Sequence, residues 1–318
     1  MAYSPIGSNN ATGDGSLPTN KAVDRELFQT KFSTDVLRYF MDTNVAKALI
    51  TTKSIDSGKA ENFPIVGNAT AQSVANDASE LAVQNISATE RTIVIDDMVV
   101  SHAYLTDLDK AMAHYDSQSA QAESIGRAMS KKVDIDVIAK VIEAGDVTDA
   151  TSAGTAGLKA FTDDVFTSNV EDDLTSGSGV YSAAVKAVAE YDDKDAVGEP
   201  VFLFRTNQYY SLLNNPAQTG LTWVNDPFAQ SGKVPMLLGK KVLKSPHFPA
   251  LAGASIAAGE VGGILFAKEA VGMLELIGIQ SRVDYVPNRL AHLITSKMAV
   301  GYGILNHACA INIKQETP

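Results

Sequence analysis

The sequence contains a single cysteine, Cys309, among its 318 residues. One cysteine excludes an internal disulfide and a multi-cysteine metal cluster, and we expect it to be a small buried hydrophobic residue in a strand. No apolar run approaches the roughly 18 residues that a membrane-spanning helix needs. The N-terminal region also lacks the basic-then-apolar pattern of a signal peptide. These absences predict a globular protein that is made and kept in a cytoplasm and does not enter a membrane.

Basic residues are also scarce. The chain has 26 Lys and Arg against 37 Asp and Glu, which gives a formal net charge of −11. Such a surface repels nucleic acid phosphates over a Debye length of roughly 8 Å at physiological salt, and no run of four or more Lys or Arg overrides it. The composition therefore disfavours direct DNA binding, although it suits a protein that lies near DNA without adhering to it.

Recognisable catalytic and metal-binding patterns are missing too. The five histidines are scattered, and no pair has the spacing of a local metal site. No GxGxxG, P-loop, GxSxG or EF-hand pattern occurs. We therefore predict no catalytic residue, no metal and no cofactor. An enzyme with a cryptic site is the alternative, and it would need His102, His114, Asp96 or Asp97 to converge around a pocket.

The most regular feature is the stretch from Thr106 to Gly145, in which apolar residues recur with a mean spacing of about 3.6, the period of a helix. These residues are Met112, Tyr115, Ala122, Ile125, Met129, Val133, Val137 and Val141. Thr106 followed by Asp109 is a weak capping box, and Gly145 is a suitable C-terminal stop. Gly126 opposes an unbroken helix by only about 1 kcal/mol. We predict one amphipathic helix, roughly 55 Å long, whose apolar stripe is core against a sheet.

The segment before this helix has two distinct parts. Met1 to Asn20 is rich in Gly, Ser, Asn and Pro, and we expect a flexible arm. A short amphipathic helix is predicted from Asp24. Its apolar residues are Leu27, Phe28, Phe32, Val36, Leu37 and Phe40. This helix either packs on its own subunit or lies on a neighbouring chain.

Two strand-like runs follow, at Lys59 to Val66 and at Arg91 to Val100. The polar stretch between them, Asn68 to Ala88, is too long for a tight hairpin turn. A long two-stranded projection is only marginally stable in water by itself. The pattern therefore implies a partner that covers the projection, most simply another copy of the chain.

The rest of the chain alternates helix and strand and then returns to long strands. Helices are predicted at Val180–Glu190 and Gln208–Leu213, and strands at Pro200–Phe204, Gly239–Leu243, Val261–Phe266, Ile277–Tyr285, Ala291–Leu305 and Ala308–Lys314. This order predicts an α+β fold, in which a compact α/β unit is inserted between segments that form one sheet-plus-helix unit.

Several stretches resemble a known family. Leu27–Ser33, Ser54–Gly67, Thr92–Asp97, Asp107–Asp116 and Gly301–Ala310 resemble the capsid protein of short-tailed phages of the T-seven type. The order of elements is similar to the Hong Kong 97-type fold of the major capsid proteins of tailed bacteriophages. The resemblance spans nearly the whole chain and is most specific in its first half.

The resemblance implies a division of the chain into parts. These are an N-terminal arm at 1–50, an extended loop at 51–100 that lies over the adjacent subunit, a peripheral domain with the spine helix at 101–174, an axial domain at 175–271, and strands at 272–318 that complete the peripheral and axial domains. It establishes neither a covalent crosslink nor a cleaved propeptide, and the short segment before Lys21 argues against a long cleaved one.

It also implies a structural function. The chain would self-assemble as hexamers and pentamers into the icosahedral head of a virion, with a scaffolding protein and a portal as partners. Double-stranded DNA would be enclosed without sequence-specific binding. The alternative is an encapsulin-type bacterial compartment shell, which shares the fold.

We predict inter-subunit contacts on the arm, the extended loop and the charged face of the spine helix, where Glu123 and Asp136 each lie four residues before a basic residue. The predicted contact residues are Phe28, Phe32, Val74, Leu81, Val83, Ile86, Arg91, Arg127 and Lys131.

Overall fold

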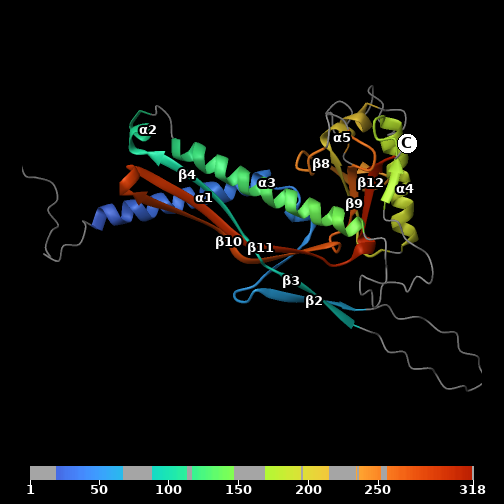
Figure 1. The fold of residues 1–318 in the computed structure, drawn as a ribbon, viewed down its shortest axis with the longest axis horizontal. Coiled ribbons are helices and arrows are strands. Elements are labelled where there is room, and N and C mark those ends of the chain that lie inside the picture. The colour runs from blue at the N-terminus through green and yellow to red at the C-terminus, as the bar shows by residue number, and fades with distance from the viewer. Residues whose placement is uncertain are drawn as a thin grey trace, which may run out of the picture. The chain divides into compact units, whose positions relative to one another are not determined.

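The computed structural model describes residues 19–66, 88–112, 117–146, 169–194, 196–214, 234, 236–251 and 256–316 (Figure 1). Its helices are α1 (Thr19–Thr43), α2 (Asp107–Met112), α3 (Ser117–Gly145), α4 (Gly177–Asp193) and α5 (Thr206–Leu213), with short 3-10 turns η1 (Lys47–Leu49), η2 (Pro287–Arg289) and η3 (His307–Cys309). Its strands are β1 (Thr51–Ser54), β2 (Ala60–Val66), β3 (Ala88–Val94), β4 (Met98–Thr106), β5 (Asn169–Asp172), β6 (Val201–Arg205), β7 (Met236–Leu237), β8 (Lys240–Ser245), β9 (Val261–Phe266), β10 (Val271–Val286), β11 (Ala291–Ile304) and β12 (Ala310–Gln315).

The chain divides into two compact units. One comprises Met1–Thr43, Val99–Ser130 and Gly278–Met298, and the other comprises Asn44–Met98, Lys131–Ile277 and Ala299–Pro318. The strands form a four-stranded sheet in the order β1-β10-β11-β4, a six-stranded sheet in the order β5-β12-β9-β6-β8-β7, and the two-stranded ribbon β2-β3. The predicted mixture of helices and long returning strands is confirmed.

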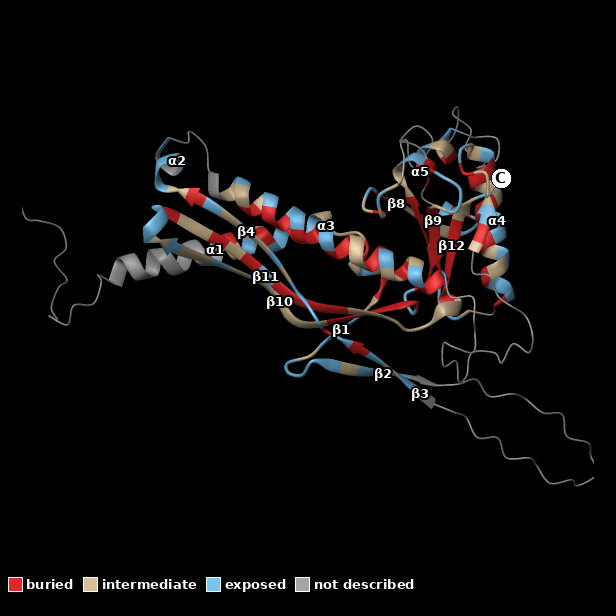
Figure 2. Cartoon of the chain, in the orientation of Figure 1, coloured by how far each residue is buried: buried red, intermediate tan, exposed pale blue. Residues whose placement is uncertain are grey.

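Helix α3 confirms the central part of the predicted helix and its end at Gly145. The stripe from Ala122 to Val141 is buried at every predicted position that the structure describes in α3 (Figure 2). The predicted start differs, because the structure has a separate helix α2 and Met112 is 59% exposed. Thr106 caps the first turn of α2, since the Asp109 N–H donates to Thr106 Oγ1 at 3.0 Å, and the Thr106 hydroxyl in turn donates to the Asp109 carboxylate at 2.6 Å. Residues 113–116, including Tyr115 and His114, lie outside the described residues.

One of the two predicted ion pairs on α3 forms. Arg127 contacts Glu123 at 2.7 Å, as expected. Asp136, however, pairs with Lys132 at 2.7 Å, while Lys140 pairs with Glu143. The prediction for Asp136 was wrong because a second lysine one turn towards the N-terminus competes for the same carboxylate.

The predicted N-terminal helix is longer than expected, because α1 begins at Thr19. Phe32, Val36 and Phe40 are buried within the chain, which supports packing on the same subunit. Gly126 of α3 explains how closely the two helices approach. A Cβ at Gly126 would lie 2.8 Å from the Val36 carbonyl oxygen. The glycine that disfavours the helix locally is therefore required by its packing on α1.

The predicted run from Arg91 to Val100 is two strands and not one. β3 ends at Val94, β4 begins at Met98, and Asp96 and Asp97 lie exposed between them. The reason is that the chain changes sheets here, from the ribbon to the four-stranded sheet. Adjacent solvated carboxylates suit such a junction.

The six-stranded sheet contains a large part of the described core. Phe202, Leu203 and Phe204 of β6 are fully buried, and every residue of β9 is buried. The C-terminal strand β12 lies between β5 and β9, so this α/β unit is not built from one continuous insertion. Helix α4 packs on β5 and β12, and α5 packs on β6 and β8.

The end of α3 is held against this sheet by Asn312 of β12. The Asn312 amide donates to the Ile142 carbonyl oxygen at 2.9 Å, which satisfies a helix-terminal acceptor. A Cβ at Gly145 would lie 2.7 Å from Asn312 Cγ, so this stop position also requires glycine for space.

Cys309 is buried, as predicted, but it lies in the turn η3 and not in a strand. Its Sγ lies 3.4 Å from the Val197 carbonyl oxygen. Burial raises the pKa of the thiol to about 12. The side chain therefore behaves as a packed apolar group.

Candidate assembly surfaces

Strands β2 and β3 pair with each other as a two-stranded ribbon, as the sequence predicts. Its register runs from Ala60 opposite Val94 to Val66 opposite Ala88. Its outer face carries polar cross-strand contacts, in which Asn62 bonds to Thr92 and to Glu90, each at 2.7 Å. Residues 67–87 lie outside the described residues, and with them the predicted contacts Val74, Leu81, Val83 and Ile86.

Glycines in the four-stranded sheet allow the base of the ribbon to lie directly on it. A Cβ at Gly301 of β11 would lie 2.5 Å from the Val94 carbonyl oxygen, and one at Gly303 would lie 2.6 Å from Ile93 Cγ1. A Cβ at Gly272 of β10 would lie 2.9 Å from Ile93 Cδ1. We call these three glycines the floor under β3. At each of them a side chain with a Cβ would collide with β3 unless the neighbouring atoms moved.

Apolar burial anchors the ribbon at this point. Ile93 and Ile95 are buried with Leu274 and Ala299, and partly buried side chains pack around them. Full burial of an isoleucine contributes roughly 1.5–3 kcal/mol. The Ile95 N–H also donates to the Lys59 carbonyl oxygen at 2.9 Å, which closes the base of the ribbon. Beyond this base, the described side chains of β2 and β3 are exposed or half-buried.

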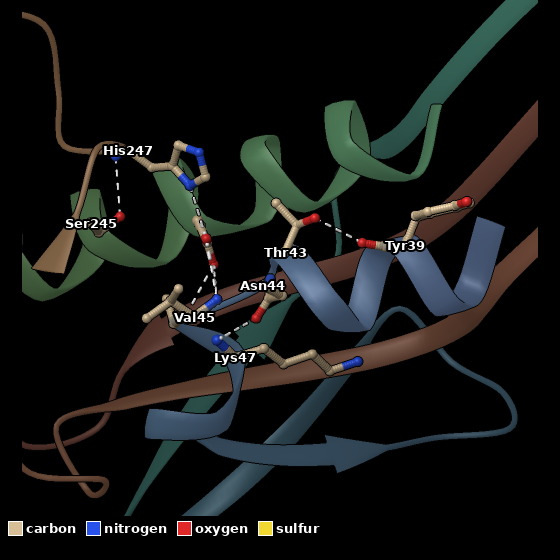
Figure 3. Close-up of polar contacts among 9 residues, drawn as sticks. Tyr39, Thr43, Asn44, Val45, Lys47, Ser245 and His247 are labelled. Carbon is tan, nitrogen blue, oxygen red and sulfur yellow. Dashed lines mark hydrogen bonds and ion pairs between the residues drawn. The ribbon is translucent and has the colours of Figure 1, made fainter. Parts of the chain in front are cut away.

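A buried carboxylate, which the sequence did not single out, joins three segments. Asp134 of α3 is fully buried and accepts hydrogen bonds from the backbone N–H of Ala46 at 3.0 Å and of Val45 at 3.3 Å (Figure 3). His247 Nδ1 lies 2.9 Å from the same carboxylate. The Lys47 N–H donates to Asn44 Oδ1 at 2.8 Å, which begins the turn η1. The only signal in the sequence was a charged residue beside the apolar stripe.

The remaining predicted contact residues have different surroundings. Arg91 is half-buried on β3, and Lys131 is exposed on α3. The side chain of Arg127 is 63% exposed and is paired with Glu123. Phe32 is only 4% exposed because its side chain packs within its own chain. We therefore do not propose it as an inter-subunit contact. Nothing is described for the side chain of Phe28.

The histidines serve separate local contacts. His307 Nδ1 lies 3.1 Å from the Ala144 carbonyl oxygen, and burial lowers its pKa. His292 lies 3.6 Å from Asp107, and Asp96 pairs with Lys59 at 3.0 Å. Within the described part of the chain, no group of three or more His, Cys, Asp or Glu side chains is arranged to hold a metal ion.

No helix in the described ranges has the length and apolar character needed to cross a membrane.

Comparison with known proteins gives one consistent result. Residues 62–314 match the model of the family described as Gp10A-like major capsid protein. The chain is 25% identical over 313 residues to the major capsid protein of Escherichia phage T7, covering 89% of this chain and 90% of that one.

Two solved structures show the same fold. The capsid structure of cyanophage P-SCSP1u aligns with a TM-score of 0.67 at 22% identity, covering 86% of this chain and 89% of that chain. A virus-like particle from Pyrococcus furiosus aligns with a TM-score of 0.58 at 11% identity, covering 90% of this chain and 99% of that chain. The predicted capsid-type α+β fold is confirmed. The chain belongs to the Gp10A-like major capsid protein family, and it is a structural component of the phage shell in the virion.

Proposed function

We propose that this capsid protein assembles as hexamers and pentamers into an icosahedral head that encloses double-stranded DNA. The observation that carries the proposal is the ribbon β2-β3, which is anchored at its base on Gly301 and Gly303 and exposed beyond it. An exposed two-stranded ribbon is marginal in water, so a neighbouring subunit that covers it stabilises it. In a closed shell many weak contacts of this kind form together, so their combined stabilisation of the assembly is large.

Within this proposal, the parts of the chain keep the roles that the family resemblance implies. Residues 1–50 form the arm, 51–100 the loop over the adjacent subunit, 101–174 the peripheral domain and 175–271 the axial domain, with 272–318 completing both. A scaffolding protein and a portal are the further partners. The formal net charge of −11 lets packed DNA lie against the shell without adhering to it. The chain has no catalytic role in this function.

The loop between β2 and β3 provides the direct test. Replacing Val74, Leu81, Val83 and Ile86 together by serine removes the predicted apolar contacts and keeps the length of the chain. We expect soluble subunits that no longer form closed particles, as seen by electron microscopy. The matched control replaces Thr70, Ser73, Ser79 and Ser87 by alanine in the same segment, and it should assemble. Normal shells from the serine variant would refute the role of the loop.

An encapsulin-type compartment is the alternative that the sequence leaves open, and the match to the Gp10A-like major capsid protein family disfavours it. The contents of purified particles separate the two. Packaged double-stranded DNA supports the phage head, whereas a specific cargo protein without DNA supports the compartment.

A further inference from the structure

The six-stranded sheet is electrically polarised across its width. The edge strand β5, the helix α4 that packs on it and the C-cap residue Lys194 span residues 169–194, which contain six acidic residues and two lysines. Lys186 pairs with Asp172 and Lys194 pairs with Glu190, which leaves four of the carboxylates outside these two pairs. The opposite edge consists of β8 and β7, on the side where α5 packs. Helix α5 and residues 236–251 contain three lysines and no acidic residue. In Figure 1, α4 and β8 lie on opposite sides of β9 and β12.

The lysines of the basic edge are concentrated on β8. Lys241 and Lys244 are exposed, and Lys240 is half-buried. Lys244 donates to the Tyr210 hydroxyl at 2.7 Å and lies 4.6 Å from the centre of that ring, so it has a local structural role. Lys240 and Lys241 pair with β7 through the backbone, so they lie next to the outermost strand of the sheet, and as consecutive strand residues they project from its two faces.

Apolar side chains lie beside these charges. Met236 is 61% exposed, Tyr210 is 47% exposed and Leu238 is 40% exposed. Leu238 also has a φ of 52°, in the left-handed region where a leucine costs roughly 1–2 kcal/mol and glycine or asparagine fits better. Leu238 and Met236 are exposed close together in the chain, and Tyr210 is exposed at Lys244. Exposed methionine and tyrosine are side chains in which protein interfaces are enriched.

The acidic edge presents its charge in a form that a neighbour can reach. Asp192 and Asp193 are exposed at the C-terminal end of α4. That end also carries the negative pole of the helix dipole, and the C-cap residue Lys194, which pairs with Glu190 at 3.4 Å, is buried beneath the two exposed carboxylates. Val185, on the same helix, is 41% exposed.

We propose that the basic edge of one copy, Lys240 and Lys241 with Met236 and Leu238, docks against the acidic edge of the next copy around Asp192 and Asp193. Opposite charges on opposite edges favour a head-to-tail contact, and such heterologous contacts form rings where the rotation between copies closes. The proposal rests on the proposed function, since it assigns the contact within each hexamer or pentamer.

Charge at the rim also suits a chain that closes two kinds of ring. Exposed ion pairs contribute only about 0–1 kcal/mol each and do not demand one fixed geometry. They act over a screening length of roughly 8 Å, so the same edges attract each other at the angles of a fivefold and of a sixfold ring. A second copy is a better occupant than DNA, because the complementary acidic surface belongs to the same chain and its net charge of −11 repels phosphates.

Charge reversal tests the pairing. The double variant Lys240→Glu/Lys241→Glu makes both edges acidic, and Asp192→Lys/Asp193→Lys makes both edges basic. Lysine at the end of a helix is compatible with the helix dipole, and thermal melting of the subunits checks that each variant folds. We expect each double variant to stay unassembled under conditions in which the wild type forms rings and shells. The quadruple variant restores complementarity with the wild-type net charge, and we expect it to assemble again.

Mixing the two double variants gives a sharper result. The chains then alternate around a ring, so only even-membered rings close. We expect hexamers in native mass spectrometry but no pentamers and no closed shells in electron microscopy.

The results that would overturn the proposal are distinct. Normal assembly of Lys240→Glu/Lys241→Glu would overturn the edge pairing and leave the lysines the role of protecting a sheet edge, which a charged glutamate can also fill. A folded quadruple variant that fails to assemble would also overturn it. Normal assembly combined with weaker binding of a DNA fragment would assign the lysines to DNA. If the wild type itself forms no closed particles, the result refutes the proposed function, and the edge pairing within its rings is refuted with it.

Discussion

Asp134 and His247 form a buried pair in which His247 Nδ1 lies 2.9 Å from the Asp134 carboxylate. The side chain of Asp134 is fully buried, and that of His247 is 13% exposed. A carboxylate only accepts hydrogen bonds, so Nδ1 carries the proton and donates. With the N–H groups of Val45 and Ala46 on the same carboxylate, this pair joins α3 to the start of η1 and to the segment after β8.

Replacing Asp134 by alanine should be among the most destabilising substitutions in the chain. It leaves the Val45 and Ala46 N–H groups and the His247 donor without their acceptor, and each buried unsatisfied group costs about 1–3 kcal/mol. We expect a loss of at least about 3 kcal/mol in the free energy of unfolding, measured by urea denaturation of unassembled subunits.

Asp136→Ala is the matched control for this substitution. Asp136 lies two residues further along the same helix and makes only a surface pair with Lys132. Its loss should cost about 0–1 kcal/mol. Equal losses for the two alanine variants would show that the buried network contributes no more than a surface ion pair.

The elements that sequence predicts well here are those whose pattern is local. The stripe from Ala122 to Val141 repeats with the helical period, and the run from Pro200 to Phe204, which forms most of β6, is short and continuously apolar. The run from Arg91 to Val100 shows the limit of such patterns. Its β-branched residues favour strand throughout, yet the chain changes sheets after Val94. The sequence of this run does not show that its first half pairs with β2 and its second half with β11.

The features that were missed depend on residues distant in sequence. Asp134 acts on Val45, Ala46 and His247, and Gly301 makes room for Val94. The pattern of apolar residues shows that a charged residue lies near an apolar stripe, or that a glycine lies in a strand. It does not show which distant residue contacts it. The family resemblance supplied the architecture, but it did not supply these contacts.

Gly126→Ala should destabilise the protein although alanine is the better helix former. In an exposed helix, this change stabilises by about 1 kcal/mol. Here the new methyl group would lie 2.8 Å from the Val36 carbonyl oxygen and 3.0 Å from Tyr39 Cβ, so α1 must shift. Overpacking of this kind costs about 1–3 kcal/mol. We expect a lower melting temperature in thermal denaturation followed by circular dichroism.

Ala128→Gly, at an exposed position on the same helix, isolates the effect of propensity. It should also lower the melting temperature, by the amount that corresponds to about 1 kcal/mol. Both changes are therefore unfavourable although one adds a methyl group and the other removes one. A higher melting temperature for Gly126→Ala would show that α1 does not pack closely at this position.

Gly301→Ala should loosen the base of the ribbon. The added Cβ would lie 2.5 Å from the Val94 carbonyl oxygen, and the backbone cannot rotate away as a flexible side chain could. We expect faster hydrogen exchange at the amides of β3 and faster proteolysis within the ribbon in unassembled subunits. Exchange in the six-stranded sheet should change little.

Gly239→Ala controls for a generic glycine effect. Gly239 has a φ of 76°, and no atom lies within 4 Å of a Cβ built there. Its replacement costs backbone strain of about 1 kcal/mol without a clash. Exchange at β3 should therefore stay at the wild-type level in this variant. Equal exchange at β3 for both alanine variants would contradict a specific floor under the ribbon.

His307 should make the subunit less stable as the solution becomes acidic. Burial lowers its pKa below the ordinary value of 6.5, because the charged imidazolium is poorly solvated there. The unfolded chain therefore binds a proton more readily than the folded chain. Stability from this group is present above about pH 6.5 and is lost as the pH falls towards the lowered pKa, at a rate of at most about 1.4 kcal/mol per pH unit.

The variant His307→Asn separates this contribution from that of the other titrating groups. The Asn Nδ2 occupies a place similar to that of the imidazole Nδ1, so it can keep the bond that His307 makes to the Ala144 carbonyl oxygen at 3.1 Å. Asparagine does not titrate. Urea denaturation between about pH 7.5 and about pH 5.5 should therefore show a shallower loss of stability for the variant than for the wild type. Identical slopes would mean that His307 takes up its proton as readily in the folded chain as in the unfolded one.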